Sequence, residues 1–244
     1  MSKRLEELAF SPTPIGDVSL RRRIDPTTGV DIFEVKLGDE FLMSSMFTAA
    51  EIALSRIGLA RLHRDVLDVV VGGLGLGYTA ARALEDPRVR ELRVVEFLEP
   101  VIDWHARGLV PVGPVLTADP RCVFQQGDFF AMSLGDGYDP GSPGRLYDAV
   151  LLDIDHSPRH VLDDGSASFY GLDGMRAVAS HLAPVGVYAM WSNDPPDAAY
   201  IEILNQVFDE VDADVITFPN PLQGRDATAT IYVGTNRKAS GEDQ

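Results

Sequence analysis

Glycines occupy four of six positions in one short stretch of the sequence, a spacing that allows a ligand to approach the backbone closely. They are Gly72, Gly73, Gly75 and Gly77. The apolar residues 69–71 precede them and an alanine-rich segment, residues 78–84, follows, so the order predicts strand, turn and helix. A Cβ at these positions would keep the backbone away from a ligand, and the start of a helix offers unpaired N–H groups. The stretch predicts nucleoside binding, with a tight turn that binds nothing as the alternative.

An acid follows the next apolar segment. Residues 92–95 are predicted to form a second strand, and Glu96 comes directly after it, nineteen positions beyond Gly77. A carboxylate at this distance can accept hydrogen bonds from both hydroxyls of a ribose. A solvated strand end is the alternative for Glu96. The combination of strand, glycine turn, helix and acid favours the ribose interpretation.

A second acid follows a third predicted strand, residues 121–126. Gly127 and Asp128 come next, and the Asp128 carboxylate can accept a hydrogen bond from the exocyclic amine of an adenine. The neighbouring rings of Phe129 or Phe97 can flank the base. The alternative for Asp128 is a helix N-cap, which is a frequent role of aspartate.

Two acids and a histidine follow a fourth predicted strand, residues 147–152. They are Asp153, Asp155 and His156. A carboxylate beside a reactive carbon suits a reaction in which an amine loses a proton as it attacks, and such general-base catalysis is worth about 10²–10⁴-fold. A divalent-metal site and simple loop polarity are the alternatives, and we expect no metal because further ligands are missing. Surface positions are expected for His63, His105 and His181.

Strands and helices alternate along most of the chain. Helices are predicted at residues 47–62, 99–107, 170–182 and 196–208. A turn at residues 184–186 precedes a fifth strand, residues 187–191. Alternation of this kind predicts a parallel sheet covered by helices on both faces, with its ligands at the carboxyl ends of the strands. The glycines and the three groups of acids should therefore line one crevice.

The chain is predicted to comprise a small subdomain, a large domain and a tail. Residues 1–46 contain turn signals and three predicted strands, at 18–21, 30–35 and 40–43, which indicates a small antiparallel β subdomain. Residues 47–234 form the predicted Rossmann-like domain. It ends in an antiparallel hairpin, residues 214–218 and 228–233, and residues 235–244 form a polar tail.

The composition excludes several classes of partner. The formal charge of −16 over 244 residues argues against nucleic acid and anionic membranes, since neither is attracted to a strongly negative surface. The single cysteine, Cys122, excludes an internal disulfide and a site made of several cysteines. No apolar run approaches the length of a membrane span, and the first residues lack the pattern of a signal peptide. We expect a soluble cytoplasmic protein, a homodimer, that acts on a small molecule.

The ordered motifs resemble those of the class I S-adenosylmethionine-dependent transferases, and more closely those of the spermidine synthase-like (polyamine aminopropyltransferase) branch. The resemblance covers residues 38–191, including the sequence Gly-Asp-Glu-Phe at 38–41. It implies that residues 72–77, Glu96, Asp128 and Asp153 bind decarboxylated S-adenosylmethionine and activate an attacking amine. Val70 and Val71 stand where many methyltransferases place an acid, which is a further similarity to the aminopropyltransferases.

The sequence departs from that pattern at three places. Gly75 stands where the family usually has an aspartate, and the family's Asp-Ser-Ser/Thr-Asp-Pro loop is here Asp-Ile-Asp-His-Ser-Pro, residues 153–158. Leu42 and Met43 follow Asp-Glu-Phe where the family has a tyrosine. The resemblance therefore extends to the nucleoside site more fully than to the acceptor site.

The first hypothesis is a transferase that uses S-adenosylmethionine or its decarboxylated form as co-substrate, without a metal. It would move an aminopropyl group to a small amine acceptor, with Asp153 as the base. Asp155 and His156 would orient the acceptor, and residues 156–168 would act as a lid. One alternative is an S-adenosylmethionine-dependent small-molecule methyltransferase, and the second is a non-catalytic nucleoside-binding protein.

Overall fold

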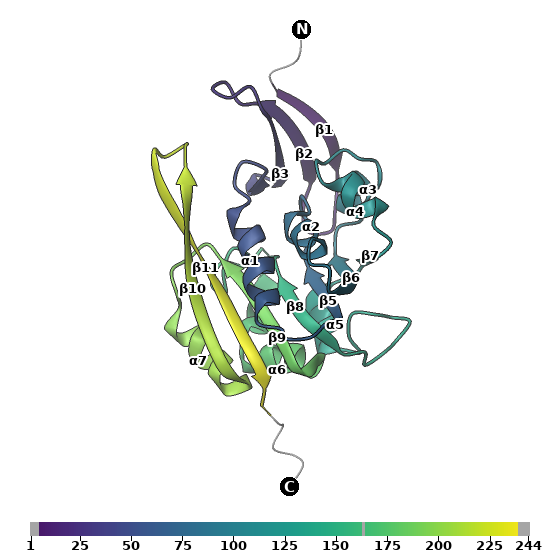
Figure 1. The fold of residues 1–244 in the computed structure, drawn as a ribbon. Helices are drawn as coiled ribbons and strands as arrows, with labels where there is room; N and C mark the ends of the chain where they lie inside the picture. Colours follow the sequence, from purple (N-terminus) through teal and green to yellow (C-terminus); the bar gives the residue numbers. More distant parts are fainter. Residues whose placement is uncertain (1–4, 163, 239–244) are drawn as a thin grey trace.

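The computed structural model describes residues 5–162 and 164–238, which form two separate β-sheets. The larger sheet has seven strands in the order β10-β11-β9-β8-β5-β6-β7 (Figure 1). These are β5 (Leu67–Gly72), β6 (Val89–Glu96), β7 (Cys122–Gln126), β8 (Tyr147–Leu152), β9 (Leu182–Ser192), β10 (Phe208–Asn220) and β11 (Arg225–Arg237). Strands β5 to β9 pair in parallel, and β11 and β10 extend the sheet antiparallel beside β9. The predicted Rossmann-like sheet with a terminal antiparallel hairpin is confirmed.

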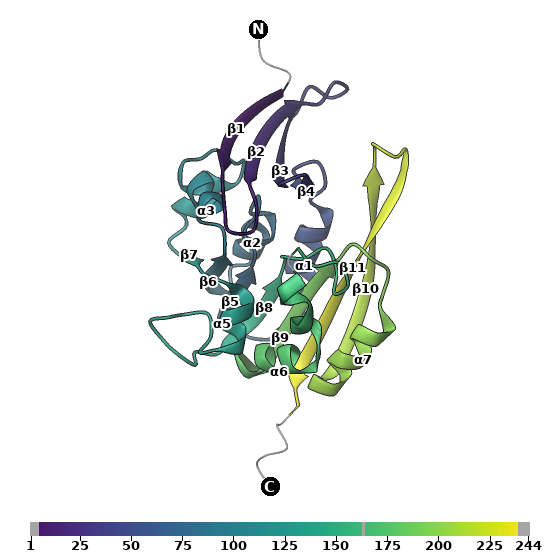
Figure 2. The same ribbon diagram turned by 180° about the vertical axis from the view of Figure 1, so that it is seen from behind.

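Helices cover both faces of this sheet. Those on one face are α1 (Ala49–Ala60), α2 (Tyr78–Leu84), α3 (Glu99–Ala106) and α4 (Gly113–Ala118). Those on the other are α5 (Phe129–Leu134), α6 (Leu172–Ser180) and α7 (Ala198–Val207). Figure 1 shows α1 in front of the sheet, and Figure 2 shows α6 in front of the opposite face. Within the described residues, every helix is too short or too polar to span a bilayer.

Strand β5 illustrates why the central strands are apolar throughout. Its side chains alternate between the faces, so that Val69 and Val71 belong to the core beneath α1 to α4, while Val70 belongs to the core beneath α5 to α7. All six residues of β5 are buried. Because both faces of β5 are covered, a ligand can approach this strand only at its carboxyl end, where the glycines begin.

The smaller sheet is antiparallel and stands at the end of the molecule where the hairpin β10–β11 also projects (Figures 1 and 2). Its strands, in spatial order, are β1 (Leu5–Ser11), β2 (Val18–Ile24), β3 (Asp31–Leu37) and β4 (Glu40–Ser44). The predicted small N-terminal β subdomain is confirmed as a separate sheet, with one strand more than expected. Strand β1 was not predicted because Glu6 and Glu7 interrupt its apolar residues. In the structure, Glu6 pairs with Arg22 of β2 and Glu7 pairs with Arg21.

Several boundaries differ from those predicted. The short helices α4 and α5 were not expected, and residues 184–186 lie inside β9 at a shift of register rather than in a turn before it. The hairpin strands are longer than predicted because cross-strand pairing continues from Phe208 with Arg237 to Asn220 with Arg225. Strand β11 thus runs past residue 235, where the polar tail was predicted to begin. Residues 239–244 of that tail lie outside the described residues.

Candidate active site

A cavity of about 460 Å³ opens at the carboxyl edge of the large sheet. Its wall is built from the small sheet, α1, the glycine turn, the ends of β6 and β8, the start of α5 and the hairpin β10–β11. It brings together most of the predicted site residues: Gly73, Gly75, Glu96, Phe97, Asp128, Phe129, Asp153, Asp155 and His156. Among the described residues, the lining contains five acids and neither lysine nor arginine. The cavity therefore suits a ligand that carries positive charge.

The glycine turn contributes two of its four glycines to the cavity. Gly73 has φ +93°, and a Cβ there would lie 2.1 Å from the backbone oxygen of Asp153. Gly75 has φ +47°, and a Cβ there would lie 2.4 Å from the sulfur of Met43, which also accepts a hydrogen bond from the Leu76 N–H. The thioether of Met43 thus fills the space beside Gly75. A Cβ at Gly73 would displace the backbone of Asp153, and a Cβ at Gly75 would displace the side chain of Met43.

The other two glycines serve packing and do not line the cavity. A Cβ on Gly72 would lie 2.6 Å from the ring of Phe129, and one on Gly77 would lie 2.7 Å from His105. Gly77 is also the N-cap residue of α2, with φ +88°. These two glycines let the turn fold tightly against α3, α4 and α5. Of the four glycines predicted to contact a ligand, only Gly73 and Gly75 line the cavity.

Glu96 is 8% exposed and holds the glycine turn in place. Its Oε2 accepts from the Leu74 N–H at 2.9 Å and its Oε1 from the Leu98 N–H at 2.8 Å. Burial raises the pKa of this carboxyl, and the backbone N–H groups act against that shift. Glu96 therefore joins β6 to the glycine turn and presents its carboxyl to the cavity at the position where a ribose is predicted.

Asp128 caps α5, as its alternative interpretation predicted. Its Oδ1 accepts from the N–H groups of Phe130 and Ala131, at 2.9 and 3.2 Å. The side chain also lines the cavity, where Oδ2 makes no hydrogen bond with the described residues. The cap fixes the orientation of the carboxyl, so the two roles proposed for Asp128 are compatible.

Of the two rings predicted to flank a base, Phe97 and Phe129, only Phe97 offers an open face. Phe97 is 42% exposed at the cavity, whereas Phe129 is 2% exposed and stacks on Tyr138 at 5.0 Å. Phe129 forms part of the cavity wall beneath Gly72. The half-buried ring of Phe130, which the sequence analysis did not single out, lines the same cavity and offers a second surface for a base.

Asp153 lines the cavity together with a second acid that the sequence did not single out. The Thr79 hydroxyl donates to its Oδ2 at 2.5 Å, and burial raises its pKa to about 6. Glu51, in the first turn of α1, is 9% exposed and lines the same cavity. Burial, and then the negative charge of Asp153, raise the pKa of Glu51 to about 8. A pKa near 6 suits Asp153 to exchanging a proton at neutral pH.

Asp155 is 1% exposed, and its carboxyl anchors the following loop. Its Oδ1 accepts from the Leu162 N–H at 2.7 Å and its Oδ2 from the Tyr170 hydroxyl at 2.5 Å. The loop is also fixed from outside, because Arg159 pairs with Asp197 ahead of α7. Residues 156–162 of the predicted lid thus form a tethered loop, residue 163 lies outside the described part, and residues 164–168 belong to a 3₁₀-helix, η1 (Asp164–Tyr170). Asp155 holds this loop and also lines the cavity, and its role in orienting an acceptor stays a prediction.

His156, at the start of the tethered loop, faces strand β4 of the small sheet. Its Nε2 is 3.2 Å from Glu40 Oε1, and its ring lies edge-on to Trp191 at 6.4 Å. All three residues are near the cavity, and Trp191 lines it together with His156. The indole N–H of Trp191 has no hydrogen-bond partner among the described residues. This side of the cavity can therefore hold a polar group of a second ligand.

Two histidines predicted at the surface are buried instead. His105 is fully buried, and its Nε2 lies 2.9 Å from the carbonyl oxygen of Gly75, so that it supports the glycine turn from α3. Burial lowers the pKa of His105. His181 is 5% exposed and contacts the carbonyl oxygen of Ser133. The prediction failed because both carbonyl partners come from distant segments, which make a buried imidazole acceptable.

In the part of the chain that the structure describes, His, Cys, Asp and Glu side chains form no group of three or more that could hold a metal ion. The five acids of the cavity come from four separate segments, and four of them accept hydrogen bonds from backbone N–H groups or hydroxyls. The arrangement can position a nucleoside and exchange a proton at Asp153.

The fold is that of the spermidine synthases. A spermidine synthase in complex with the transition state analogue AdoDATO matches with a TM-score of 0.70 and 14% identity, over 94% of this chain and 73% of that one. The spermidine synthase of Thermotoga maritima matches with a TM-score of 0.67 and 14% identity, over 94% and 72% of the two chains. A probable spermidine synthase from Corynebacterium glutamicum matches with a TM-score of 0.64 and 17% identity, over 97% and 82%. No protein-family model and no curated protein matches the sequence. The chain is thus spermidine synthase-like in fold, as the sequence motifs predicted.

Proposed function

We propose that the protein is an aminopropyltransferase-like enzyme of polyamine biosynthesis, which uses decarboxylated S-adenosylmethionine as co-substrate and a small amine as acceptor. The observation that carries this proposal is the lining of the cavity, where five acids stand without a lysine or arginine among the described residues. A ligand with a sulfonium and an ammonium group complements these charges. A neighbour in fold is a spermidine synthase that binds AdoDATO, which supports the same class of ligand.

The nucleoside half of the co-substrate would lie against the glycine turn. Glu96 would accept hydrogen bonds from the ribose hydroxyls, and Asp128 Oδ2 would accept one from the adenine amine. The rings of Phe97 and Phe130 would contact the base. In this orientation the sulfonium would lie toward Gly73 and Gly75, near the end of β8, where the backbone oxygen of Asp153 packs against Gly73 and the residue lines the same cavity.

The transfer itself is a displacement at carbon. The acceptor ammonium gives a proton to Asp153, and the freed nitrogen lone pair attacks the carbon bonded to the sulfonium. The carbon–sulfur bond breaks, its electron pair returns to sulfur, and methylthioadenosine leaves as a neutral thioether. Because the sulfonium is already a good leaving group, the protein mainly aligns the two reactants and excludes water.

The experiment that tests this proposal is incubation of the protein with decarboxylated S-adenosylmethionine and, in separate reactions, putrescine or spermidine. We expect an aminopropylated amine and methylthioadenosine in equal amounts by mass spectrometry. A parallel reaction with S-adenosylmethionine tests the methyltransferase alternative. Methylated amine from S-adenosylmethionine, without any aminopropylated product, would refute the proposal.

A further inference from the structure

Glu51 is an acid on the buried side of a helix. It lies in the first turn of α1 between Ala50 and Ala53, which both belong to the apolar core. Only 9% of the residue is exposed, and it lines the cavity rather than the outer surface. A buried carboxyl costs free energy unless a partner compensates it, so its position requires an explanation.

The neighbour of Glu51 is another carboxyl and not a cation. Thr79 Oγ1 lies 2.5 Å from Asp153 Oδ2 and 3.5 Å from the backbone oxygen of Glu51, so that α1 and the end of β8 meet at this hydroxyl. The negative charge of Asp153 raises the pKa of Glu51 further than burial does alone. Both acids line the same cavity, and the repulsion between their negative charges favours a state in which they hold one proton between them.

The groups that surround this pair do not neutralise it. From α2, Tyr78 faces Glu51, whose charge contributes after burial to raising the pKa of Tyr78. The remaining titratable groups of the cavity are Glu96, Asp128, Asp155 and His156, from the other strand ends. Neither lysine nor arginine lines the cavity within the described residues. The compensating cation must therefore come from a ligand.

We propose that Glu51 and Asp153 together bind one ammonium group of the ligand, and that Glu51 selects ligands whose ammonium group has no carboxylate beside it. This inference rests on the proposed function and adds to it a residue that determines specificity. In the free protein the pair holds one proton. When an ammonium group binds, that proton passes to the solvent, and both carboxylates then face the cation.

The selection follows from charge. Decarboxylated S-adenosylmethionine brings an ammonium group on an aliphatic chain, which the carboxyl pair attracts. S-adenosylmethionine brings a carboxylate to the same place, where two acids repel it and no basic side chain of the lining receives it. Glu51 therefore disfavours the carboxylated form in addition to attracting the decarboxylated one.

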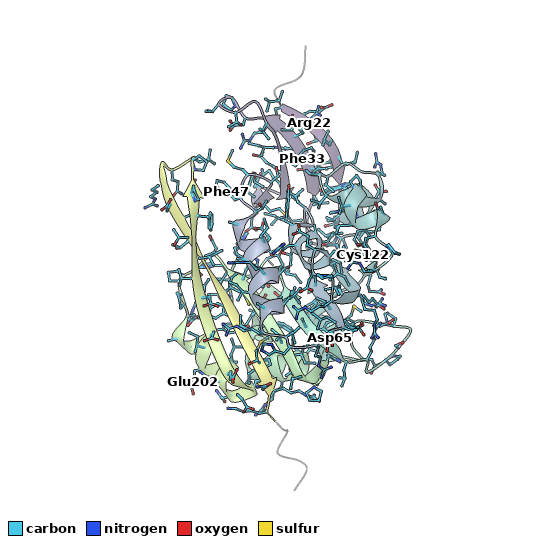
Figure 3. The ribbon with its side chains drawn as sticks, in the orientation of Figure 1. Arg22, Phe33, Phe47, Asp65, Cys122 and Glu202 are labelled. Carbon is cyan, nitrogen blue, oxygen red and sulfur yellow. The ribbon has the colours of Figure 1, made fainter. Side chains whose placement is uncertain are left out.

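Calorimetric titration of wild type and Glu51→Gln tests this inference. The titrants are decarboxylated S-adenosylmethionine, methylthioadenosine, and an adenosine with a 5′-dimethylsulfonium group, which has the sulfonium but no ammonium. Each titration is run near pH 7 in two buffers with different ionisation enthalpies, so that proton release is measured directly. Glu202→Gln is the control, since Glu202 is exposed on α7, at the opposite end of the molecule from Phe47 of the cavity wall (Figure 3).

We expect wild type to release up to one proton with decarboxylated S-adenosylmethionine and none with the two ligands that lack an ammonium group. Glu51→Gln should bind the decarboxylated form about 10- to 100-fold more weakly, the range of a lost charge-assisted hydrogen bond, and should release no proton. Its affinity for the other two ligands should equal that of wild type, which also shows that the variant folds. Glu51→Asp, which keeps the charge, should recover part of the lost affinity.

The outcomes separate this inference from the proposed function. If methylthioadenosine does not bind wild type, the nucleoside site and the proposed function fail, and the inference fails with them. If all three ligands weaken equally in Glu51→Gln, Glu51 supports the structure only and the inference is wrong. Unchanged affinity for the decarboxylated form would also overturn it, while leaving the proposed function intact.

Discussion

The Asp153 carboxyl combines three properties of a general base: it lies in the cavity, its orientation is fixed by Thr79, and burial brings its pKa to about 6. Each property follows from the fold. The backbone N–H of Asp153 donates to the Gly72 carbonyl at 2.8 Å, so the end of β8 is locked to the end of β5. The residue cannot move away from the glycine turn without breaking the sheet edge.

Replacement of this base gives the first prediction. Asp153→Asn keeps the shape and removes the proton acceptor, so turnover with the amine acceptor should fall about 10²–10⁴-fold, the usual contribution of a general base. Methylthioadenosine has no group that needs this base, so its binding should change little. Steady-state kinetics and titration measure the two effects. Unchanged turnover in Asp153→Asn would exclude the residue as the base.

The second prediction concerns stability and pH. Glu51 ionises near its usual pKa of 4.5 in the unfolded chain and at about 8 in the folded one, so the unfolded chain loses its proton first as the pH rises. The stability that depends on this carboxyl is therefore complete below about pH 4.5 and declines until about pH 8, by up to about 1.4 kcal/mol per pH unit. Glu51→Gln stays neutral and avoids this loss.

Denaturant unfolding at several pH values checks the effect. Glu51→Gln should be more stable than wild type by about 2–4 kcal/mol at pH 8, and the difference should mostly vanish near pH 5. Glu202→Gln, an exposed position on α7, is the matched control. A constant difference at all pH values would mean that Glu51 does not carry a raised pKa.

The residues found from the sequence and those missed differ in a physical way. Glu96, Asp128 and Asp153 were predicted because each directly follows an apolar strand, and parallel strands bring such positions to one edge. Glu51 and His105 lie on helices, where position in the sequence does not say which distant segment they face. Only the packing of α1 and α3 against the sheet brings them to the cavity and the glycine turn.

At the scale of elements, the glycine turn gives a third prediction. Gly73→Ala forces a left-handed φ on a residue with a Cβ and drives that Cβ into the backbone of Asp153, whereas Gly224→Ala has a similar φ and open space around it. The φ alone costs about 1–2 kcal/mol, so Gly224→Ala should lose about that much. Gly73→Ala should lose several kcal/mol and also its affinity for methylthioadenosine.

Thermal unfolding and titration compare these two variants. The comparison isolates the contact with Asp153, since both glycines have positive φ. Equal losses of stability would show that the turn tolerates a side chain and that Gly73 does not pack tightly on the backbone of Asp153.

The tethered loop gives a fourth prediction. Tyr170→Phe removes one donor from the buried Asp155 carboxyl, which should cost about 1–3 kcal/mol. Asp155 also accepts a hydrogen bond from the Leu162 N–H, so the variant should hold the loop at residues 156–162 less firmly. Hydrogen exchange of these amides should speed up, while exchange in β11 should stay as in wild type. Unchanged exchange in the loop would show that Asp155 does not anchor it.

Strong local patterns explain which elements the sequence predicts. Strand β8 matches its predicted bounds, 147–152, because five of its six residues are apolar or aromatic and the strand is bounded by an arginine-containing loop and by Asp153. Helices α4 and α5 have only six residues each, too few to establish a helical period. Strand β9 includes a proline that usually signals a turn, and the register shift against β8 accommodates it.

At the scale of the whole molecule, charge separates two regions. The cavity at the carboxyl edge is acidic without basic side chains in its described lining, while at the other end of the sheet arginines neutralise the acids. There, Arg145 contacts Asp68, Glu91 and Asp139, and Arg93 contacts Glu91 and Asp139. The acids of the cavity are thus left uncompensated by the protein, which is the condition for binding a cationic ligand. The expected homodimer stays a prediction, which light scattering can test.

The most direct test of a cavity that selects a cationic co-substrate is the ratio of two dissociation constants, those of wild type for S-adenosylmethionine and for its decarboxylated form, measured by calorimetry in one buffer. The two ligands differ by one carboxylate, so the ratio measures how much the acids of the cavity weaken the binding of a ligand with an added negative charge. We predict that the decarboxylated form binds at least about tenfold more tightly, which corresponds to about 1.4 kcal/mol. Equal binding, or preference for S-adenosylmethionine, would contradict the proposed selection of the decarboxylated form by the acids of the cavity.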